Sequence, residues 1–245
     1  MHEIAIASSA VQRLCWTRII NSMERLIGDF RDLTEPQLKF LSRINEDRQF
    51  TDVFFFTGGT LLKALGIVPR TSNDLDFFTF SHVVSRDFFA AQLRARDLME
   101  EVFGSSSIVP ADKGFLHRDS GMVIDIVADG SPNIQPFELF GNLKTASLED
   151  LAAHKASALC SRDEIKDYTD IAFLTKKQGW LLKDLAQFSE QKFNLGTISE
   201  EKLLTELLAK RDQFSVSSSI FLREPEKNIA ITNSQIDYLI EQTAI

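Results

Sequence analysis

The strongest structural signal in the chain is VFFFTGGTLLKALGIVPRTSNDLDFFTF, residues 53–80. It opens with a short apolar run, Val53–Phe56, which has the residue types of a strand and stops at a Gly-Gly-Thr turn. A short helix is predicted over Leu61–Leu65, because a glycine follows it and Pro69 lies just beyond. Asp74–Phe80 then reads as a second strand. This order of strand, turn, helix and strand predicts a small α/β sheet domain.

Helices are expected on the N-terminal side of this stretch. Residues 11–30 mix apolar and charged residues at helical spacing. A second helix is predicted to begin after Thr34, because Thr34 and Gln37 have the spacing of a capping box and Pro36 falls in the first turn.

A longer helix and a hairpin are expected on the C-terminal side. Over residues 85–103 the apolar residues recur at three- and four-residue steps, which gives one apolar stripe. The runs Gly114–Arg118 and Met122–Ala128 flank an Asp-Ser-Gly turn and predict a hairpin. Together these elements extend the sheet domain over about residues 50–140.

The remainder of the chain is predicted to be helical. A stretch containing Pro, Gly and Asn, residues 132–145, is interpreted as the boundary, which predicts two domains, residues 1–140 and 141–245. The least periodic segment, Phe214–Asn233, is predicted to be a long loop. The fold class is therefore mixed α/β (α+β), with a sheet domain, N-terminal helices and a helical C-terminal domain. Helical periodicity covers residues 147–162, 164–178, 180–192, 198–212 and 233–243.

The composition is that of an ordinary globular protein, with 44% hydrophobic and 25% charged residues among 245. Twenty Phe residues predict a core filled mainly by phenylalanine. A net charge of −8 argues against a broadly basic nucleic-acid surface, although one local basic cleft stays compatible with it. Two distant cysteines predict reduced thiols, and no apolar run reaches the length of a membrane span, so a cytoplasmic location is expected.

The residues best suited to binding or catalysis are glycines and aspartates of the sheet domain. A Gly58-Gly59 turn between a strand and a helix exposes backbone N–H groups to phosphate oxygens. Asp74 and Asp76 are two residues apart on a strand, so both side chains point to one face. Asp125 adds a third carboxylate between two isoleucines. Three converging carboxylates suit Mg²⁺, with Mn²⁺ as the alternative, because such ions take oxygen ligands and share them with substrate phosphates.

Each of these features also has a simpler interpretation. A lone Gly-Gly pair is usually only a turn, and a lone Asp-x-Asp is more often surface charge than a metal site. Asp125 could face solvent from an edge strand. The joint order of the three features within one small domain favours a site.

The stretch that carries these glycines and aspartates resembles a known family. Residues 56–78 are similar to the first motif of the nucleotidyl transferase AbiEii/AbiGii-type toxin family, within the polymerase-β-like nucleotidyltransferase superfamily. The matching positions are Gly58, Gly59, Thr60, Arg70, Ser72, Asp74, Leu75, Asp76 and Phe77. The resemblance spans about residues 50–175 and continues with Asp125 and a helical signature of Lys155, Arg162, Asp167 and Asp170.

The resemblance implies a nucleotidyltransferase fold and transfer of a nucleoside monophosphate from an NTP, with release of pyrophosphate. It implies metal ligation by Asp74, Asp76 and Asp125. It also implies the toxin of a type IV toxin–antitoxin or phage-defence system, with a separate antitoxin protein and an RNA acceptor, plausibly tRNA. The phosphates are expected to contact Gly58, Gly59, Thr60, Arg70, Ser72, Lys155 and Arg162.

The helical signature has its own physical argument. Lys155 and Arg162 fall inside the apolar arc of their helix, while His154 falls on the opposite face. Long basic side chains on an inward face can extend outward to water, or Lys155 can reach a triphosphate. Asp167 and Asp170 are on a helix that is apolar toward its end, and buried acids are normally paired. They are expected to hold Lys155 or Arg162 in place, or, in the case of Asp170, to serve catalysis directly.

Three other functions stay open from the sequence. The same carboxylates would serve a nucleotidyltransferase that acts on a small molecule such as an antibiotic, or one that modifies a protein. A regulator that keeps the fold without catalysis is the third, although unpaired acids without a metal repel one another. The four histidines show no ligand spacing, which argues against zinc.

Overall fold

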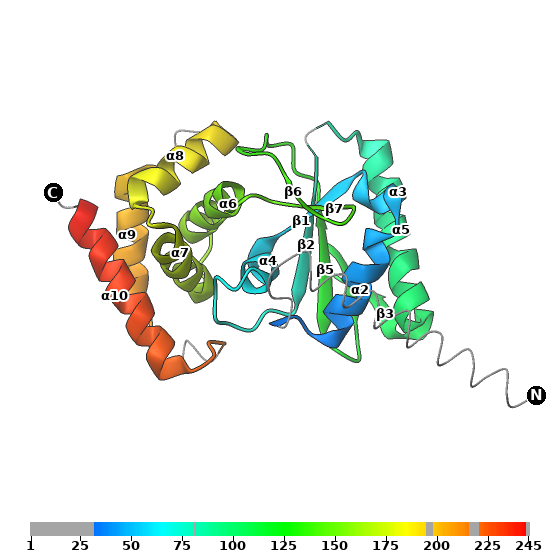
Figure 1. Cartoon of the computed structure of the whole chain (residues 1–245), viewed down its shortest axis with the longest axis horizontal. Coiled ribbons are helices and arrows are strands. Elements are labelled where there is room, and N and C mark those ends of the chain that lie inside the picture. Colours follow the sequence, from blue (N-terminus) through cyan, green and yellow to red (C-terminus); the bar gives the residue numbers. More distant parts are fainter. Residues whose placement is uncertain (1–31, 81, 195–197, 216–220, 244–245) are drawn as a thin grey trace, which may run out of the picture.

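A mixed sheet forms one side of the molecule and a group of helices forms the other (Figure 1). The computed structural model describes residues 32–80, 82–194, 198–215 and 221–243. The helix predicted over residues 11–30 lies outside the described residues. No helix in the described ranges has the length and apolar character needed to cross a membrane.

The sheet has seven strands in the order β3-β4-β5-β2-β1-β7-β6. Its centre pairs β2 in parallel with β5 and antiparallel with β1, which in turn pairs in parallel with β7. The outer pairs β3–β4, β4–β5 and β6–β7 are antiparallel. The strands are β1 Phe54–Thr57, β2 Asp74–Thr79, β3 Ile108–Pro110, β4 Gly114–His117, β5 Met122–Val127, β6 Glu138–Phe140 and β7 Leu143–Thr145.

Three helices cover one face of this sheet: α2 Glu35–Asn45, α3 Arg48–Thr51 and α5 Ser85–Phe103. The predicted capping box of α2 is confirmed, since the Thr34 and Gln37 side chains bond each other's backbone N–H groups. Phenylalanines fill the interface, as the composition predicted. The ring of Phe77 in β2 packs on Phe40 of α2 and on Phe50 of α3. The Phe77 face of the sheet is thus closed to solvent.

The predicted boundary stretch contains strands. The sheet runs through residue 145, so the boundary expected at residue 140 falls between β6 and β7, two strands of one sheet. Each strand is only three residues long, too short for a clear alternation of apolar and polar residues. Partners far along the chain hold them: β7 pairs with β1, and Asn45 Oδ1 accepts hydrogen bonds from the N–H groups of Asn142 and Leu143.

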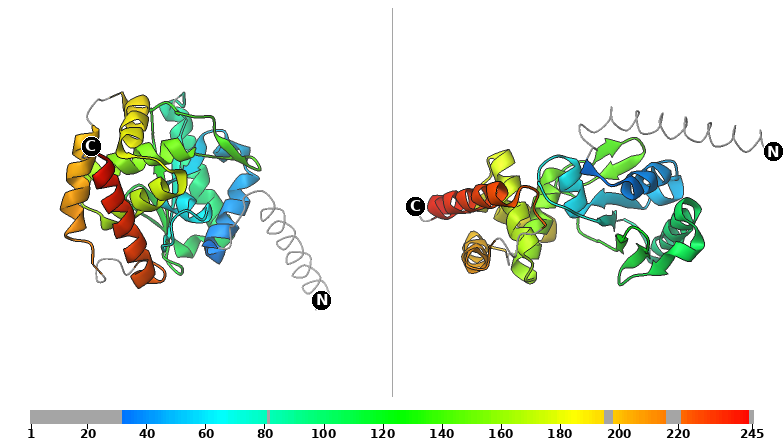
Figure 2. Two further views of the ribbon diagram at one scale, coloured as in Figure 1. Left: turned by 60° about the vertical axis from the view of Figure 1, so that its left-hand side comes forward. Right: turned by 90° about the horizontal axis from the view of Figure 1, so that it is seen from below.

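The second side of the molecule is helical, and the views in Figure 2 show its helices grouped beside the sheet. The predicted loop over Phe214–Asn233 is wrong in part, because the last helix begins at Pro225. Its buried face carries Asn228, Thr232 and Gln235, so the hydrophobic periodicity that reveals a helix is weak there. The helices are α6 Leu148–Ser161, α7 Ile165–Gln178, α8 Leu182–Phe193, α9 Glu200–Arg211 and α10 Pro225–Thr243.

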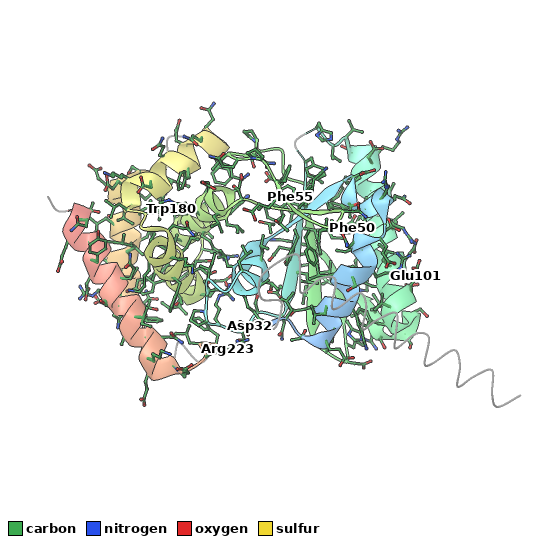
Figure 3. The ribbon with its side chains drawn as sticks, in the orientation of Figure 1. Asp32, Phe50, Phe55, Glu101, Trp180 and Arg223 are labelled. Atoms are coloured by element: carbon green, nitrogen blue, oxygen red, sulfur yellow. The ribbon has the colours of Figure 1, made fainter. Side chains whose placement is uncertain are left out.

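The segment just before α10 joins the helical side to the sheet side. The N–H of Arg223 donates to the Pro69 carbonyl at 2.9 Å, and residues 70 and 222 form an isolated antiparallel bridge. The Arg223 guanidinium also pairs with the Asp32 carboxylate, and Figure 3 shows both side chains where the two sides meet. The loop between α4, Gly58–Ala64, and β2 is thereby attached to the segment before α10.

Candidate active site

A cavity of about 490 Å³ lies between the open face of β2 and β5 and the helices α6 and α7. All three predicted carboxylates line it, and so do most of the predicted phosphate contacts. The cavity is lined by Thr57, Gly58, Gly59, Arg70, Thr71, Ser72, Asn73, Asp74, Asp76, Phe78, Asp125, His154, Lys155, Ala158, Arg162, Lys166 and Phe221.

Strand pairing brings the carboxylates together. Asp76 and Asp125 are direct partners in the parallel pair β2–β5, so their side chains leave the sheet on the same face. Asp74 shares that face because it is two residues from Asp76. The intervening residues Leu75 and Ile124 are fully buried on the opposite face. Asp125 is therefore on an inner strand, flanked by β2 and β4, and not on a solvent-facing edge.

These carboxylates have perturbed acidity. Burial, aided by the charges of Asp125 and Asp74 and opposed by that of Lys155, raises the pKa of Asp76 to about 6. Burial and the charge of Asp74 likewise raise the pKa of Asp125. Both shifts mean that the folded protein disfavours the ionised forms, as expected for like charges that lack enough compensating cations.

The donor set fits a hard divalent cation. In the part of the chain that the structure describes, no group of three or more acidic, histidine or cysteine side chains is arranged to hold a metal ion by itself. Mg²⁺ does not need one, because it usually keeps waters and shares substrate phosphate oxygens with one or two carboxylates. The uncompensated charge of Asp74, Asp76 and Asp125 on one wall of a cavity is the property that such a cation would neutralise.

The glycine turn makes room for the site's own side chains. Helix α4, Gly58–Ala64, begins at Gly58 instead of Leu61, so the two glycines form its first turn. A Cβ on Gly58 would lie 1.9 Å from Asp76 Oδ2, and one on Gly59 would lie 2.0 Å from Arg70 Nη2. Gly58 also has a φ of 80°, which side-chain-bearing residues rarely adopt. The glycines thus let a carboxylate and a guanidinium approach the backbone.

Replacing Gly58 with Ala is expected to destabilise the protein more than replacing Gly66 with Ala. Both positions have positive φ, which costs an alanine about 1 kcal/mol or more. No atom lies within 4 Å of a Cβ placed on Gly66, whereas at Gly58 the Asp76 side chain must move. Urea unfolding of both variants measures the difference, and equal losses of unfolding free energy would contradict the close approach of Asp76.

Thr60 does not have the predicted position. Its side chain is fully buried and does not line the cavity. Its hydroxyl is hydrogen-bonded to the Ser72 hydroxyl at 2.8 Å and to the backbone carbonyl of Asp74. The phosphate contact expected for Thr60 therefore does not fit this arrangement. Instead, Thr60 fastens α4 to the start of the strand that carries the carboxylates, while Ser72 lines the cavity.

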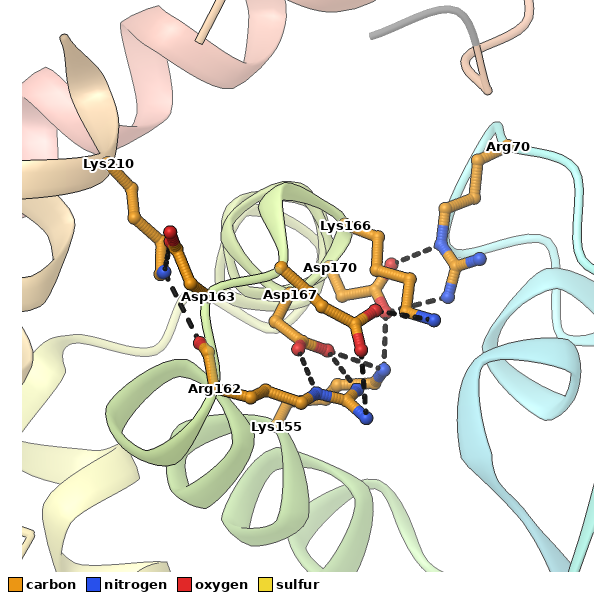
Figure 4. Close-up of polar contacts among 9 residues, drawn as sticks. Arg70, Lys155, Arg162, Asp163, Lys166, Asp167, Asp170 and Lys210 are labelled. Carbon is orange, nitrogen blue, oxygen red and sulfur yellow. Dashed lines mark hydrogen bonds and ion pairs between the residues drawn. The ribbon is translucent and has the colours of Figure 1, made fainter. Parts of the chain in front are cut away.

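Opposite the carboxylates, charged side chains form a network that we call the ion chain: Arg70, Asp170, Lys155, Asp167, Arg162, Glu164 and Lys166, in order of contact. Arg70 binds Asp170 through two hydrogen bonds of 2.6 and 2.9 Å. Lys155 Nζ lies 2.7 Å from Asp170 and 3.0 Å from Asp167, and Arg162 binds Asp167 at 2.7 and 2.9 Å. Glu164 then joins Arg162, at 3.7 Å, to Lys166, at 2.7 Å. Figure 4 shows these contacts linking the Arg70 loop to α6 and α7.

Asp167 and Asp170 are the inner members of the ion chain. Both are fully buried and neither lines the cavity. Burial alone would raise the pKa of Asp170, but the charges of Lys155 and Arg70 and their hydrogen bonds outweigh it and lower that pKa. Burial likewise opposes the charged form of Lys155, yet Asp170 and Asp167 raise its pKa. Of the two roles expected from the sequence, the geometry favours the one in which these acids hold the cations, and not a direct contact of Asp170 with substrate.

Several lining residues were not among the predicted site residues, and those with aromatic or charged side chains are Phe78, His154, Lys166 and Phe221. His154 was expected on the face opposite Lys155. His154, Ala158 and the C-cap residue Arg162 all line the cavity because residues spaced by four lie on one side of α6. That spacing was the signal in the sequence that could have identified His154. Burial, followed by the charge of Lys192, lowers the pKa of His154 to about 4, so its imidazole is neutral at pH 7. Phe221 comes from a distant segment and had no local signal.

Comparisons with known proteins identify a family and a relative that are similar in sequence. A family model of the nucleotidyl transferase AbiEii toxins of type IV toxin–antitoxin systems matches residues 39–228. An uncharacterized protein of Aquifex aeolicus is 27% identical over 143 residues, which are 57% of this chain, and the chain spans 66% of that relative's length.

Two solved structures from Helicobacter pylori are also similar. One, a candidate nucleotidyltransferase, has a TM-score of 0.49 and 15% identity, over 86% of this chain and 97% of its own. The other has a TM-score of 0.44 and 18% identity over the same shares. The family match covers most of the chain, including all the carboxylates, the glycine turn and the ion chain. The protein belongs to the nucleotidyl transferase AbiEii toxin family of type IV toxin–antitoxin systems.

Proposed function

We propose that this nucleotidyltransferase moves a nucleoside monophosphate from an NTP to an RNA acceptor, with tRNA as the first candidate, and acts as a toxin restrained by a separate antitoxin protein. One observation carries the proposal: Asp74, Asp76 and Asp125 share one wall of a cavity whose other wall is lined by cations of the ion chain. The wall of carboxylates suits the metal ion of a metal-bound triphosphate, and the wall of cations suits its phosphates.

In this proposal Asp74, Asp76 and Asp125 hold Mg²⁺ or Mn²⁺. The bound cation supplies neutralisation of phosphate charge and activation of the acceptor hydroxyl. The protein's own contribution is to keep three carboxylates on one rigid pair of strands. Because β2 and β5 are both inner strands, their relative position is fixed by hydrogen bonds on either side.

The cations and the glycine turn are proposed to hold the phosphates. Lys155 is 6% exposed, and Asp167 and Asp170 together fix its ammonium group, so it reaches the cavity as an ordered point charge. Arg70 is held by Asp170 in the same way. Gly58 and Gly59 line the cavity wall together with Ser72. Arg162 and Lys166 are more exposed and would meet the outer phosphates.

The direct test is incubation with each α-labelled NTP, Mg²⁺ and total bacterial RNA. Wild type is expected to label an RNA band, and Asp125→Asn is expected to lose at least about 100-fold of that activity, because one metal ligand is gone. Asp97→Asn is the matched control, since Asp97 is exposed on α5, on the covered side of the sheet. Labelling that is equal in wild type and Asp125→Asn would contradict the proposed site. Label entering protein or a small molecule instead would contradict the RNA acceptor.

A further inference from the structure

One aromatic residue of the cavity lining, Phe221, packs against the core and is only partly buried. Phe221 lines the cavity from the segment that precedes α10. Phe78, the other phenylalanine of the lining, has ring partners in Phe55 and His154. Among the described residues no aromatic ring packs on Phe221, and its side chain is only partly buried. Because Phe221 is only partly buried and lines the cavity, part of it is open to a ligand.

The backbone of this segment is firmly attached to the site. The Phe221 carbonyl accepts hydrogen bonds from the N–H of Thr71 at 2.9 Å and from the Thr71 hydroxyl at 3.3 Å. The next residue, Leu222, is 4% exposed and anchors the segment in the core. These contacts fix the backbone on both sides of Phe221, which is partly exposed and lines the cavity. The ring is thus positioned before any ligand binds.

The surroundings of Phe221 suit a flat ring attached to phosphates. The loop that holds it, residues 69–73, leads directly into Asp74 and carries Arg70 and Ser72, both in the cavity lining. Ala158 of α6 also lines the cavity, and its small side chain leaves space within it. Arg162 and Lys166 add positive charge to the same lining. A nucleoside triphosphate has this combination of a flat π-system and negative charge.

We propose that Phe221 stacks on the nucleobase of the NTP, an inference that rests on the proposed nucleotidyl transfer. Every nucleobase has a π-face, so the ring contributes affinity for all four NTPs and does not select among them. The base binds on the Phe221 side of the cavity, while the phosphates extend toward the carboxylate wall.

The test compares Phe221→Ala, Phe221→Leu and Phe221→Trp with wild type, with Mg²⁺ present and no RNA added. Binding of ATP, GTP, CTP and UTP and of inorganic tripolyphosphate is measured by calorimetry. Phe221→Ala and Phe221→Leu are expected to weaken binding of each NTP by about 10-fold or more, while Phe221→Trp keeps it near the wild-type value. Tripolyphosphate binding is expected to be the same in all four proteins, which also shows that the variants are folded.

Two results would overturn the stacking role. Full NTP affinity in Phe221→Leu would mean that the side chain is only an apolar cover. Equal weakening of NTP and tripolyphosphate would mean that it acts through the phosphate-binding loop. Failure of the proposed function looks different, because wild type itself would then fail to label RNA in the transfer assay, whatever its affinity for NTP.

Discussion

Asp76→Asn is expected to reduce nucleotide transfer by about 1,000-fold or more and, in the absence of metal, to make the protein more stable. The loss of activity follows from removing a carboxylate that would hold the cation, an interaction worth several kcal/mol in the transition state. The gain in stability follows from the pKa of Asp76, which burial and the neighbouring acids raise from 3.8 to about 6. A shift of that size corresponds to about 2–3 kcal/mol against the ionised folded state at pH 7.

The sign of the pH dependence follows from proton linkage. Between about pH 4 and pH 6 the folded wild type keeps the Asp76 proton that the unfolded chain has released. The contribution of Asp76 to the free energy of unfolding therefore rises as the pH falls through this range. The Asn variant has no such proton. The difference in unfolding free energy between the two proteins is therefore expected to be small below pH 4, to grow through pH 6 and to stay constant above it.

Urea unfolding in EDTA over this pH range measures the effect on stability, and the labelling assay measures the effect on transfer. Added Mg²⁺ is expected to stabilise wild type and to have a smaller effect on Asp76→Asn. Asp97→Asn again serves as the control, with both properties unchanged. An Asp76→Asn protein less stable than wild type at pH 7 in EDTA would contradict the repulsion that the geometry implies.

Asp170→Asn is expected to lower the unfolding free energy by about 3–5 kcal/mol, because it leaves two buried cations without their shared partner. Arg70 would lose two short hydrogen bonds and Lys155 would lose the nearer of its two carboxylates. Since the pKa of Asp170 is lowered in the folded protein, its contribution is present above the unfolded pKa and is lost as the pH falls through the folded value. The destabilisation should therefore be full at pH 7 and shrink in acid.

Glu164→Gln is the matched control for this prediction. Glu164 belongs to the same ion chain, but its side chain is 42% exposed. Pairs exposed to that degree contribute about 1 kcal/mol or less, so the control should unfold nearly as wild type does. The free energy of unfolding of both variants is measured by urea unfolding at pH 7. Equal losses would contradict the larger contribution expected for the buried Asp170.

The elements that were predicted well are those whose signals lie within a few residues of one another. The capping box of α2, the apolar stripe of residues 85–103 and the hairpin of β4 and β5 all appear where the sequence placed them. The elements that were missed depend on distant partners. Strand β7 pairs with β1, and the buried face of α10 carries polar residues such as Gln235, whose hydrogen-bond partner Thr175 lies on α7.

The candidate site divides in the same way. The sequence by itself determined that Asp74 and Asp76 share a face, since side chains alternate along any strand, and that glycines precede a helix beside them. Only the tertiary structure decided that Asp125 lies opposite Asp76, that Thr60 faces the loop and not the cavity, and that Asp170 is saturated by cations. It also brought Phe221 to the cavity across most of the chain. The reason is physical: periodicity and capping are local properties, whereas strand order and the pairing of buried charges depend on which distant segments come into contact.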